Sequence, residues 1–151
     1  MRAQYQVLVF PYHINDKGIE YAIFHRSDYD CWQAISGGGE EGETILESAR
    51  REANEEARIS VDSDYIKLDT VNSIPAEEFS AHILWGEDVY VIPENCFGVE
   101  IKDKELILSH EHTEYKWLSY EEARSLSKWE GNKVALLELN KRLKKRINKT
   151  S

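Results

Sequence analysis

Three glutamates in the middle of the chain have the type and spacing to do chemistry. Glu52, Glu55 and Glu56 stand at i, i+3 and i+4, so they share one face if this stretch is helical. Like charges so close together weaken a helix, whereas clustered carboxylate oxygens suit a hard cation such as Mg²⁺ or Mn²⁺. The pattern favours a divalent metal site, and an acidic, solvated helix face is the alternative.

A run of three glycines lies shortly before these glutamates. Gly37, Gly38 and Gly39 allow another segment or a ligand to approach the backbone closely. We therefore expect Gly37 and Gly38 to lie beside a bound substrate. A metal site next to a glycine-rich loop suits chemistry on phosphate groups.

The helix that carries the glutamates is predicted from Thr44 to Ala57, a stretch without Gly or Pro. Glu43 stands at its start, where the helix dipole favours negative charge. A stripe of small apolar side chains predicts close packing against a sheet. That stripe contains Leu46, Ala49, Ala53 and Ala57.

The stretch from Gly37 to Ile59 resembles the Nudix box, G-x5-E-x7-R-E-U-x-E-E-x-G-U, in which U is a bulky aliphatic residue. Two positions depart from the pattern, because Ala53 replaces the first U and Arg58 replaces the usual glycine. A glycine there would suit a left-handed helix cap. Arg58 must end the helix differently, or adopt left-handed angles at a cost of about 1 kcal/mol. The matching positions are Gly37, Glu43, Arg51, Glu52, Glu55, Glu56 and Ile59.

The resemblance implies Mg²⁺-dependent hydrolysis of a nucleoside diphosphate linked to another group, with Mn²⁺ as a possible replacement ion. Glu52, Glu55 and Glu56 would hold the metal, and Glu55 or Glu111 would act as the base. Arg51 would orient Glu43 or a ligand carboxylate through paired hydrogen bonds. The alternative is a non-catalytic Nudix-like domain that senses a nucleotide, which an incomplete box would favour.

Further residues are candidates for contact with the substrate. In the family, the strand before the box often ends in basic residues near the phosphates, which makes His25 and Arg26 candidates here. The alternative for Arg26 is that it is only a charged surface residue. Trp32 is a candidate for base stacking, with core packing as the alternative. In the loop before the last strand, Glu111 fits the family's acidic residue best and Glu114 second. His110 and His112 are either metal-contacting or solvated.

Three segments carry a closer likeness to one branch of the family. They are CWQAISGGGEEGET, REANEEARI and EHTEYKWLSYEEA. They resemble the pyrophosphatases that act on dATP and on dihydroneopterin triphosphate. Base and leaving-group choice is expected to lie in loops such as 75–87, where no sequence rule reads specificity.

The elements that must position these residues predict an α/β fold, a Nudix-type mixed β-sheet sandwiched between helices, in a single domain over residues 1–151. Trp117 is expected to be buried in the last strand. Pro11 suggests a sheet edge or a bulge, and Pro93 a break in its strand. Strands are predicted at 5–14, 20–26, 31–36, within 59–73, and at 90–101, 105–108 and 115–118, and helices at 121–129 and 133–147 with a break at 131–132.

Composition bounds the remaining expectations. The formal net charge of −9 argues against general nucleic-acid binding, so the expected partner is a small-molecule nucleotide or pyrophosphate. No long apolar run is present, which predicts a soluble cytoplasmic protein without a membrane segment. Cys31 and Cys96 are expected to be reduced and structural. The basic end of the last helix, 141–146, is either solvated or a phosphate or partner patch, and the oligomeric state is left open.

Overall fold

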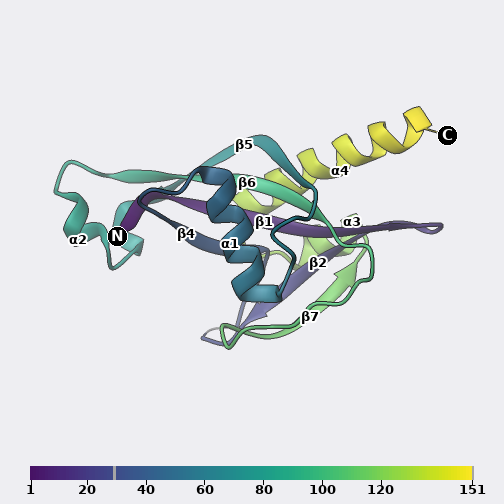
Figure 1. Ribbon diagram of the computed structural model, residues 1–151, viewed down its shortest axis with the longest axis horizontal. Coiled ribbons are helices and arrows are strands. Elements are labelled where there is room, and N and C mark those ends of the chain that lie inside the picture. Colours follow the sequence, from purple (N-terminus) through teal and green to yellow (C-terminus); the bar gives the residue numbers. More distant parts are fainter. Residues whose placement is uncertain (29, 151) are drawn as a thin grey trace.

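A seven-stranded mixed sheet forms the centre of the computed structural model (Figure 1). The structure describes residues 1–28 and 30–150, so Tyr29 and Ser151 of the predicted domain lie outside the described residues. The strand order is β3-β2-β1-β6-β5, with β4 paired to β1 and β7 paired to β2. The strands are β1 (Arg2–Asn15), β2 (Gly18–Arg26), β3 (Trp32–Gln33), β4 (Ile35–Glu40), β5 (Tyr65–Pro75), β6 (Val91–Glu100) and β7 (His112–Leu118).

The long strand β1 changes partners on one of its edges. Its first half pairs with β4 up to Val9, its second half pairs with β2 from Tyr12, and its other edge runs parallel to β6. Pro11 therefore lies in a central strand, not at the sheet edge that its residue type suggests. It sits in the gap between the two partners, where its missing N–H removes no hydrogen bond of the ladder.

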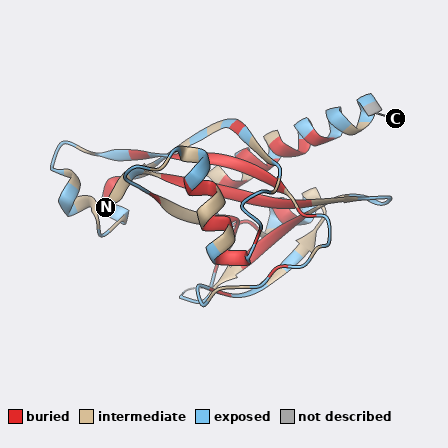
Figure 2. Cartoon of the chain, in the orientation of Figure 1, coloured by how far each residue is buried: buried red, intermediate tan, exposed pale blue. Residues whose placement is uncertain are grey.

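Helices cover both faces of this sheet (Figure 1). On one face, α1 (Ile45–Ala57) packs over a core that includes Val7, Val9 and Phe97. On the other face, α3 (Tyr120–Leu126) and α4 (Glu130–Thr150) cover a second core around Leu8 and Phe10. The buried residues concentrate on the central strands and on the inner sides of the helices (Figure 2). This arrangement confirms the predicted α/β sandwich.

A projecting arm joins β5 to β6 and carries the short 3₁₀ helix η1 (Ala76–Glu78) and helix α2 (His82–Trp85). It lies next to the start of β1, at the left of Figure 1. Trp85 Nε1 donates a hydrogen bond to the Arg2 carbonyl at 3.3 Å, and the Arg2 guanidinium lies 5.2 Å from the Phe79 ring centroid. Arg2 thereby ties the arm to the sheet.

Three predictions about the bounds of helices and strands were wrong. Residues 105–108 form no strand, because the backbone N–H of Ile107 bonds instead to the Ala57 carbonyl at the end of α1. Strand β6 runs without a break through Pro93, which precedes the start of pairing with β1 at Glu94. The helix break falls at 127–129, and residues 131–132 lie in the first turn of α4.

Two further expectations concern burial and membranes. Cys31 and Cys96 are both buried free thiols, as expected. Trp117 is only partly buried, because its indole N–H reaches outward to the Lys104 carbonyl at 3.2 Å. Within the described part of the chain, no helix has both the length and the apolar character needed to cross a membrane.

Candidate active site

Helix α1 is fixed at both ends, and this sets the direction of its carboxylates. Thr44 and Glu47 form a reciprocal capping box at the start, with Glu47 N to Thr44 Oγ1 at 3.1 Å and Thr44 N to Glu47 Oε1 at 2.7 Å. Arg58 ends the helix in the left-handed conformation, with φ 57°. Of the predicted apolar stripe, the three alanines are fully buried, whereas Leu46 is 38% exposed because it lies too near the helix start.

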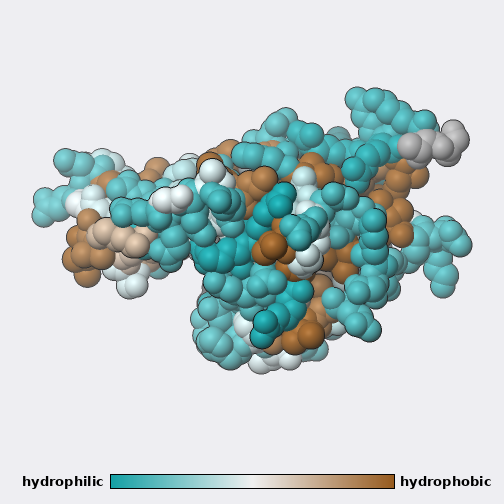
Figure 3. Space-filling view, viewed as in Figure 1, coloured by the Kyte–Doolittle hydropathy of each residue, from teal (hydrophilic) through white to brown (hydrophobic). Residues whose placement is uncertain are grey.

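Glu52, Glu55 and Glu56 come together as the sequence predicts. Each offers one carboxylate oxygen, and these oxygens lie within 4.8 Å of one another. Glu52 and Glu56 are buried, with 9% and 5% exposure, whereas Glu55 is exposed. Figure 3 shows hydrophilic residues gathered over α1 on this face. We call these three residues the carboxylate cluster.

The cluster is short of positive charge. Burial, reinforced by the charges of Glu55 and Glu56, raises the pKa of Glu52 to about 7 against the opposing effect of Arg51. Burial also raises the pKa of Glu56, and the nearby Glu111 carboxyl adds to this rise. A set of crowded, partly desolvated carboxylate oxygens fits a hard divalent cation, because the ion would supply the missing charge.

The three glycines expected in a loop lie in strand β4, which we call the glycine strand. Arg51 links the carboxylate cluster to this strand. Its Nε and Nη2 atoms bond the two oxygens of Glu43 at 2.7 and 3.0 Å, and Nη2 also reaches the Gly38 carbonyl at 2.8 Å. Nη1 lies 3.0 Å from Glu52 Oε1. The hydrogen bonds from Arg51 lower the pKa of Glu43 to about 2. This fork is the geometry expected from the sequence.

Gly37 explains why the glycine strand can lie so close to the cluster. A Cβ atom at this position would lie 2.1 Å from Cδ of Glu52. The Glu52 carboxylate thus occupies the space that any other side chain would fill. Gly37 serves the cluster in this way, whereas a side chain at Gly38 would meet the Arg2 guanidinium. The contact of Gly37 and Gly38 with a substrate stays a prediction.

The loop before β7 approaches the cluster from the other side. Ser109 Oγ donates to Glu56 Oε2 at 2.7 Å, and Ser109 N donates to the Glu56 carbonyl at 3.0 Å. Glu111 is brought close enough to raise the pKa of Glu56. Buried His112 has a lowered pKa, caused by its burial, and its Nδ1 lies 3.5 Å from Glu56 Oε2. Sequence analysis did not identify Ser109 as a site residue. Ser109 meets α1 only through the path of the loop that follows residues 105–108.

A cavity of about 560 Å³ opens on the opposite side of β4, and we call it the polar cavity. Arg26 and Ser36 line it, and Ser36 directly precedes Gly37 in β4. Trp32 is not among its described lining residues, since its ring contacts His25 and Lys116 instead, and the adjacent Gln33 faces the cavity. Glu78 falls in the expected specificity loop 75–87, whereas sequence reasoning missed the other polar lining residues, which are Gln6, Asn72, Ser73, Glu94, Glu130 and Asn132.

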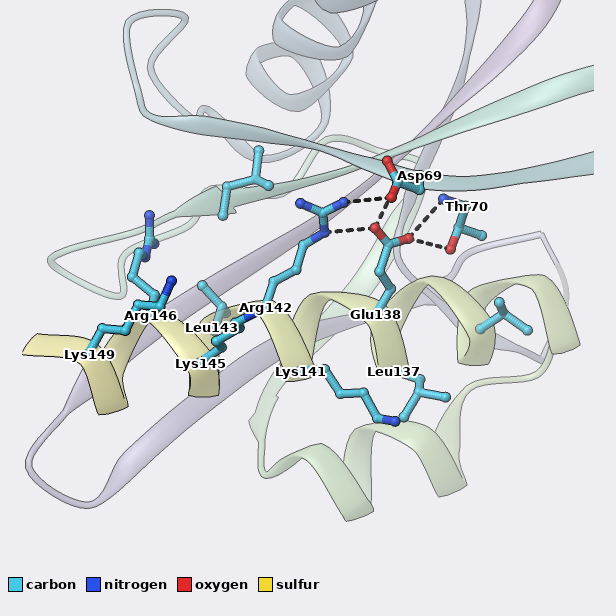
Figure 4. A pocket seen from close by; sticks show the side chains of 12 residues that line it. Asp69, Thr70, Leu137, Glu138, Lys141, Arg142, Leu143, Lys145, Arg146 and Lys149 are labelled. Atoms are coloured by element: carbon cyan, nitrogen blue, oxygen red, sulfur yellow. Dashed lines mark hydrogen bonds and ion pairs between the residues drawn. The ribbon is translucent and has the colours of Figure 1, made fainter.

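A separate basic groove lies between β5 and α4 (Figure 4). Its volume is about 1080 Å³, and Lys141, Lys145 and Lys149 line it. Arg142 is committed within the protein, to Asp69 at 3.0 Å and to Glu138 at 2.7 Å. None of the described residues of this groove belongs to the carboxylate cluster or to the polar cavity.

Comparison with known proteins places this geometry in a family. The NUDIX domain model matches residues 7–139. Dihydroneopterin triphosphate diphosphatase of Escherichia coli K12 is 34% identical over 114 residues, which are 74% of this chain and 75% of the relative. The asymmetrical bis(5'-nucleosyl)-tetraphosphatase of Rattus norvegicus is 31% identical over 130 residues, 83% of this chain and 81% of the relative.

A solved structure agrees over nearly the whole chain. A protein of Listeria monocytogenes strain 4b F2365, described as a NUDIX hydrolase, is 41% identical and superposes with a TM-score of 0.86. The match covers 95% of this chain and 97% of the Listeria chain. The chain therefore belongs to the Nudix family, and it is a Nudix pyrophosphohydrolase.

Proposed function

We propose that the protein hydrolyses a nucleoside triphosphate, or a related compound with a pyrophosphate linkage, in a Mg²⁺-dependent reaction. The observation that carries this proposal is the convergence of Glu52, Glu55 and Glu56 beside a glycine strand. Two of the three are buried without enough positive charge around them, which is costly unless a cation binds. Mn²⁺ is the alternative ion, because it accepts the same oxygen ligands.

Each residue of the site has a distinct proposed role in the hydrolysis. Glu52, Glu55 and Glu56 would hold Mg²⁺, which when bound polarises phosphoryl oxygens and lowers the pKa of water. Glu55, the exposed member of the cluster, or Glu111 would take the proton from the attacking water. The water oxygen forms a new bond to phosphorus while the bond to the bridging oxygen breaks, and a phosphate or nucleotide leaves. Arg51 positions Glu52 and does not itself need to touch the substrate.

The polar cavity offers room for the rest of the substrate. Ser36 faces this cavity, while the space beside the next residue, Gly37, is filled by the Glu52 carboxylate. A substrate seated in the cavity could therefore reach the cluster by crossing the width of one strand. Arg26 lines the cavity at the end of β2 and is paired with Asp28 at 2.6 Å, so it would accompany the phosphates only by sharing or exchanging this partner.

The decisive experiment is a turnover panel with Mg²⁺. It contains nucleoside triphosphates, nucleotide sugars, bis(5'-nucleosyl)-tetraphosphate and dihydroneopterin triphosphate, the last two suggested by the relatives' names. We expect release of phosphate or pyrophosphate, and a loss of at least about 100-fold in kcat for Glu55→Gln and Glu56→Gln. Glu41→Gln is the matched control, since Glu41 is exposed and precedes the helix.

The same panel tests the alternative of a non-catalytic sensor. Tight nucleotide binding without metal-dependent turnover would select that alternative. Wild-type turnover that persists unchanged in both glutamine variants would refute the assigned roles. We further propose one Nudix domain over residues 1–151, a small-molecule partner and a cytoplasmic location.

A further inference from the structure

The polar cavity contains a buried carboxylate that the reaction does not use. Glu94 is only 7% exposed, and it lies on β6, directly opposite Gln6 of β1 in the parallel register. Asn72 Nδ2 donates to Glu94 Oε1 at 3.0 Å. Among the described residues, none is seen to donate a hydrogen bond to the second oxygen, Oε2. Oε2 is not among the described buried atoms that lack a partner, so it opens onto the cavity and can accept a hydrogen bond from a ligand there.

The neighbours of Glu94 are already committed to other partners. Gln6 accepts a hydrogen bond from Arg2 and donates to Ser36 Oγ at 3.2 Å. Asn72 donates to Glu94 and lies 3.7 Å from Cys96 Sγ. These bonds hold the amides in place, so the amide groups beside Glu94 are not free to turn and satisfy its second oxygen.

The surroundings of Glu94 suit a flat ring. Leu8, Ile74, Pro75 and Phe79 contribute apolar surface to the same cavity. The Phe79 ring is held by the Arg2 guanidinium at 5.2 Å, so this wall is fixed in position. A heterocycle could lie against these side chains and direct its edge at the Glu94 carboxylate.

Hydrogen-bond chemistry then selects the kind of ring. A carboxylate accepts two parallel hydrogen bonds from a ring N–H and an adjacent exocyclic amino group. Guanine and the 2-amino-4-oxo pterin ring present this pair. Adenine and cytosine place a ring nitrogen lone pair next to their amino group, and uracil and thymine lack the amino group. Burial raises the pKa of Glu94, and the hydrogen bond from Asn72 opposes this rise. In its ionised form the Glu94 carboxylate repels the lone pair.

We propose that Glu94 is a specificity-determining residue that selects substrates with a 2-amino-4-oxo heterocycle, either a guanine nucleotide or a pterin triphosphate. This inference deepens the proposed function and rests on it for its kinetic test. It assigns to Glu94 binding of the ring, and no part in the chemistry at phosphorus.

The kinetic test compares GTP with ITP, which differ only in the exocyclic amino group. For the wild type we expect kcat/KM for GTP to exceed that for ITP by at least about 10-fold. Glu94→Gln should reduce this ratio to near 1, mainly through KM, because the amide cannot accept both bonds. Glu77→Gln is the matched control, since Glu77 is exposed on the neighbouring helix η1, is not among the described residues that line the cavity, and should keep the wild-type ratio.

Two further measurements separate the possible failures. Dihydroneopterin triphosphate, assayed beside GTP, distinguishes the pterin from the guanine source. Calorimetry with GMP and IMP in metal-free protein tests the inference without turnover, and GMP should bind at least about 10-fold more tightly. Absence of any turnover in the wild type would refute the proposed function, while the binding of GMP and IMP would still test the role of Glu94.

The inference on Glu94 is overturned by any of three results. They are equal kcat/KM for GTP and ITP in the wild type, a preference for ATP, or a GTP-to-ITP ratio that survives in Glu94→Gln. A melting temperature of Glu94→Gln equal to that of the wild type shows that the variant is folded. If the variant is not folded, the GTP-to-ITP ratio of the wild type and its affinities for GMP and IMP test the role of Glu94 instead.

Discussion

Arg51 and Glu43 form a two-bond fork that joins the body of α1 to the turn between β4 and α1, with Nε to Oε2 at 2.7 Å and Nη2 to Oε1 at 3.0 Å. The same guanidinium reaches the Gly38 carbonyl and Glu52. One side chain thus sets the distance between the glycine strand and a predicted metal ligand.

Replacing Arg51 by Lys should break this arrangement, because an ammonium group cannot bond Glu43 through a planar fork and reach Glu52 as well. We expect a loss of about 1–2 kcal/mol in the free energy of unfolding and a fall of at least about 10-fold in kcat/KM. Arg50→Lys is the control, since Arg50 on the same helix bonds the Val61 carbonyl, away from the cluster. Equal losses of activity in both variants would contradict the role of the fork.

Gly37→Ala should displace the Glu52 carboxylate, because the new Cβ would lie 2.1 Å from its Cδ atom. We expect Mg²⁺ affinity, measured by calorimetry, to fall by at least about 10-fold. Gly39→Ala creates a similar clash, but with the Tyr5 ring and not with a residue of the carboxylate cluster. It should lower stability while the metal affinity stays close to that of the wild type, and unchanged affinity in Gly37→Ala would count against Glu52 as a ligand.

The metal-free protein should lose stability as the pH rises toward neutrality. Burial raises the pKa of Glu52 from 4.5 to about 7, so the folded state binds this proton more tightly than the unfolded state does. The contribution of the protonated Glu52 to the free energy of unfolding is fully present below pH 4.5. It is lost as the pH rises through about 7, and the total loss is up to about 3 kcal/mol.

The difference in unfolding free energy between the wild type and Glu52→Gln, measured in a chelator from pH 4 to pH 8, isolates this contribution. Glu43, with its pKa lowered to about 2 by Arg51, acts with the opposite sign but largely cancels in that difference. A difference that does not vary with pH would show that Glu52 titrates normally.

Arg58→Gly should stabilise the protein, because Arg58 occupies the left-handed region with φ 57°. The expected gain is about 1 kcal/mol in denaturant unfolding, with turnover unchanged. Lys104→Gly relieves a similar angle, φ 59°, but it also removes the ion pair of Lys104 with Glu20 at 2.9 Å. It should therefore gain less than Arg58→Gly, and a destabilised Arg58→Gly variant would contradict this account of the cap.

The carboxylate cluster could be predicted because its geometry is local. Glu52, Glu55 and Glu56 share a helix whose start and face follow from neighbouring residues, and Arg51 reaches Glu43 only eight positions away. The architecture was predictable because strands flank α1 on both sides in the sequence and two helices close the chain, as the resemblance to the family also implied.

The polar cavity could not be predicted, because its residues come from strands far apart in the sequence. Gln6, Asn72 and Glu94 meet only through the pairing of β1, β6 and β5. Pro11 and Pro93 misled for the same reason, since the cost of a proline depends on whether a neighbouring strand needs its N–H. Residues 105–108 have the composition of a strand, and only the nearby end of α1 explains their irregular path.

Trp129 gives the protein an optical reporter of its own. Its indole N–H bonds Gln33 Oε1 at 3.0 Å in the wall of the polar cavity, while the side chain remains 42% exposed. A compound that enters the cavity would change the solvation of this indole and hence its fluorescence emission. Occupancy could then be titrated by light alone, with metal-free protein and unlabelled compounds.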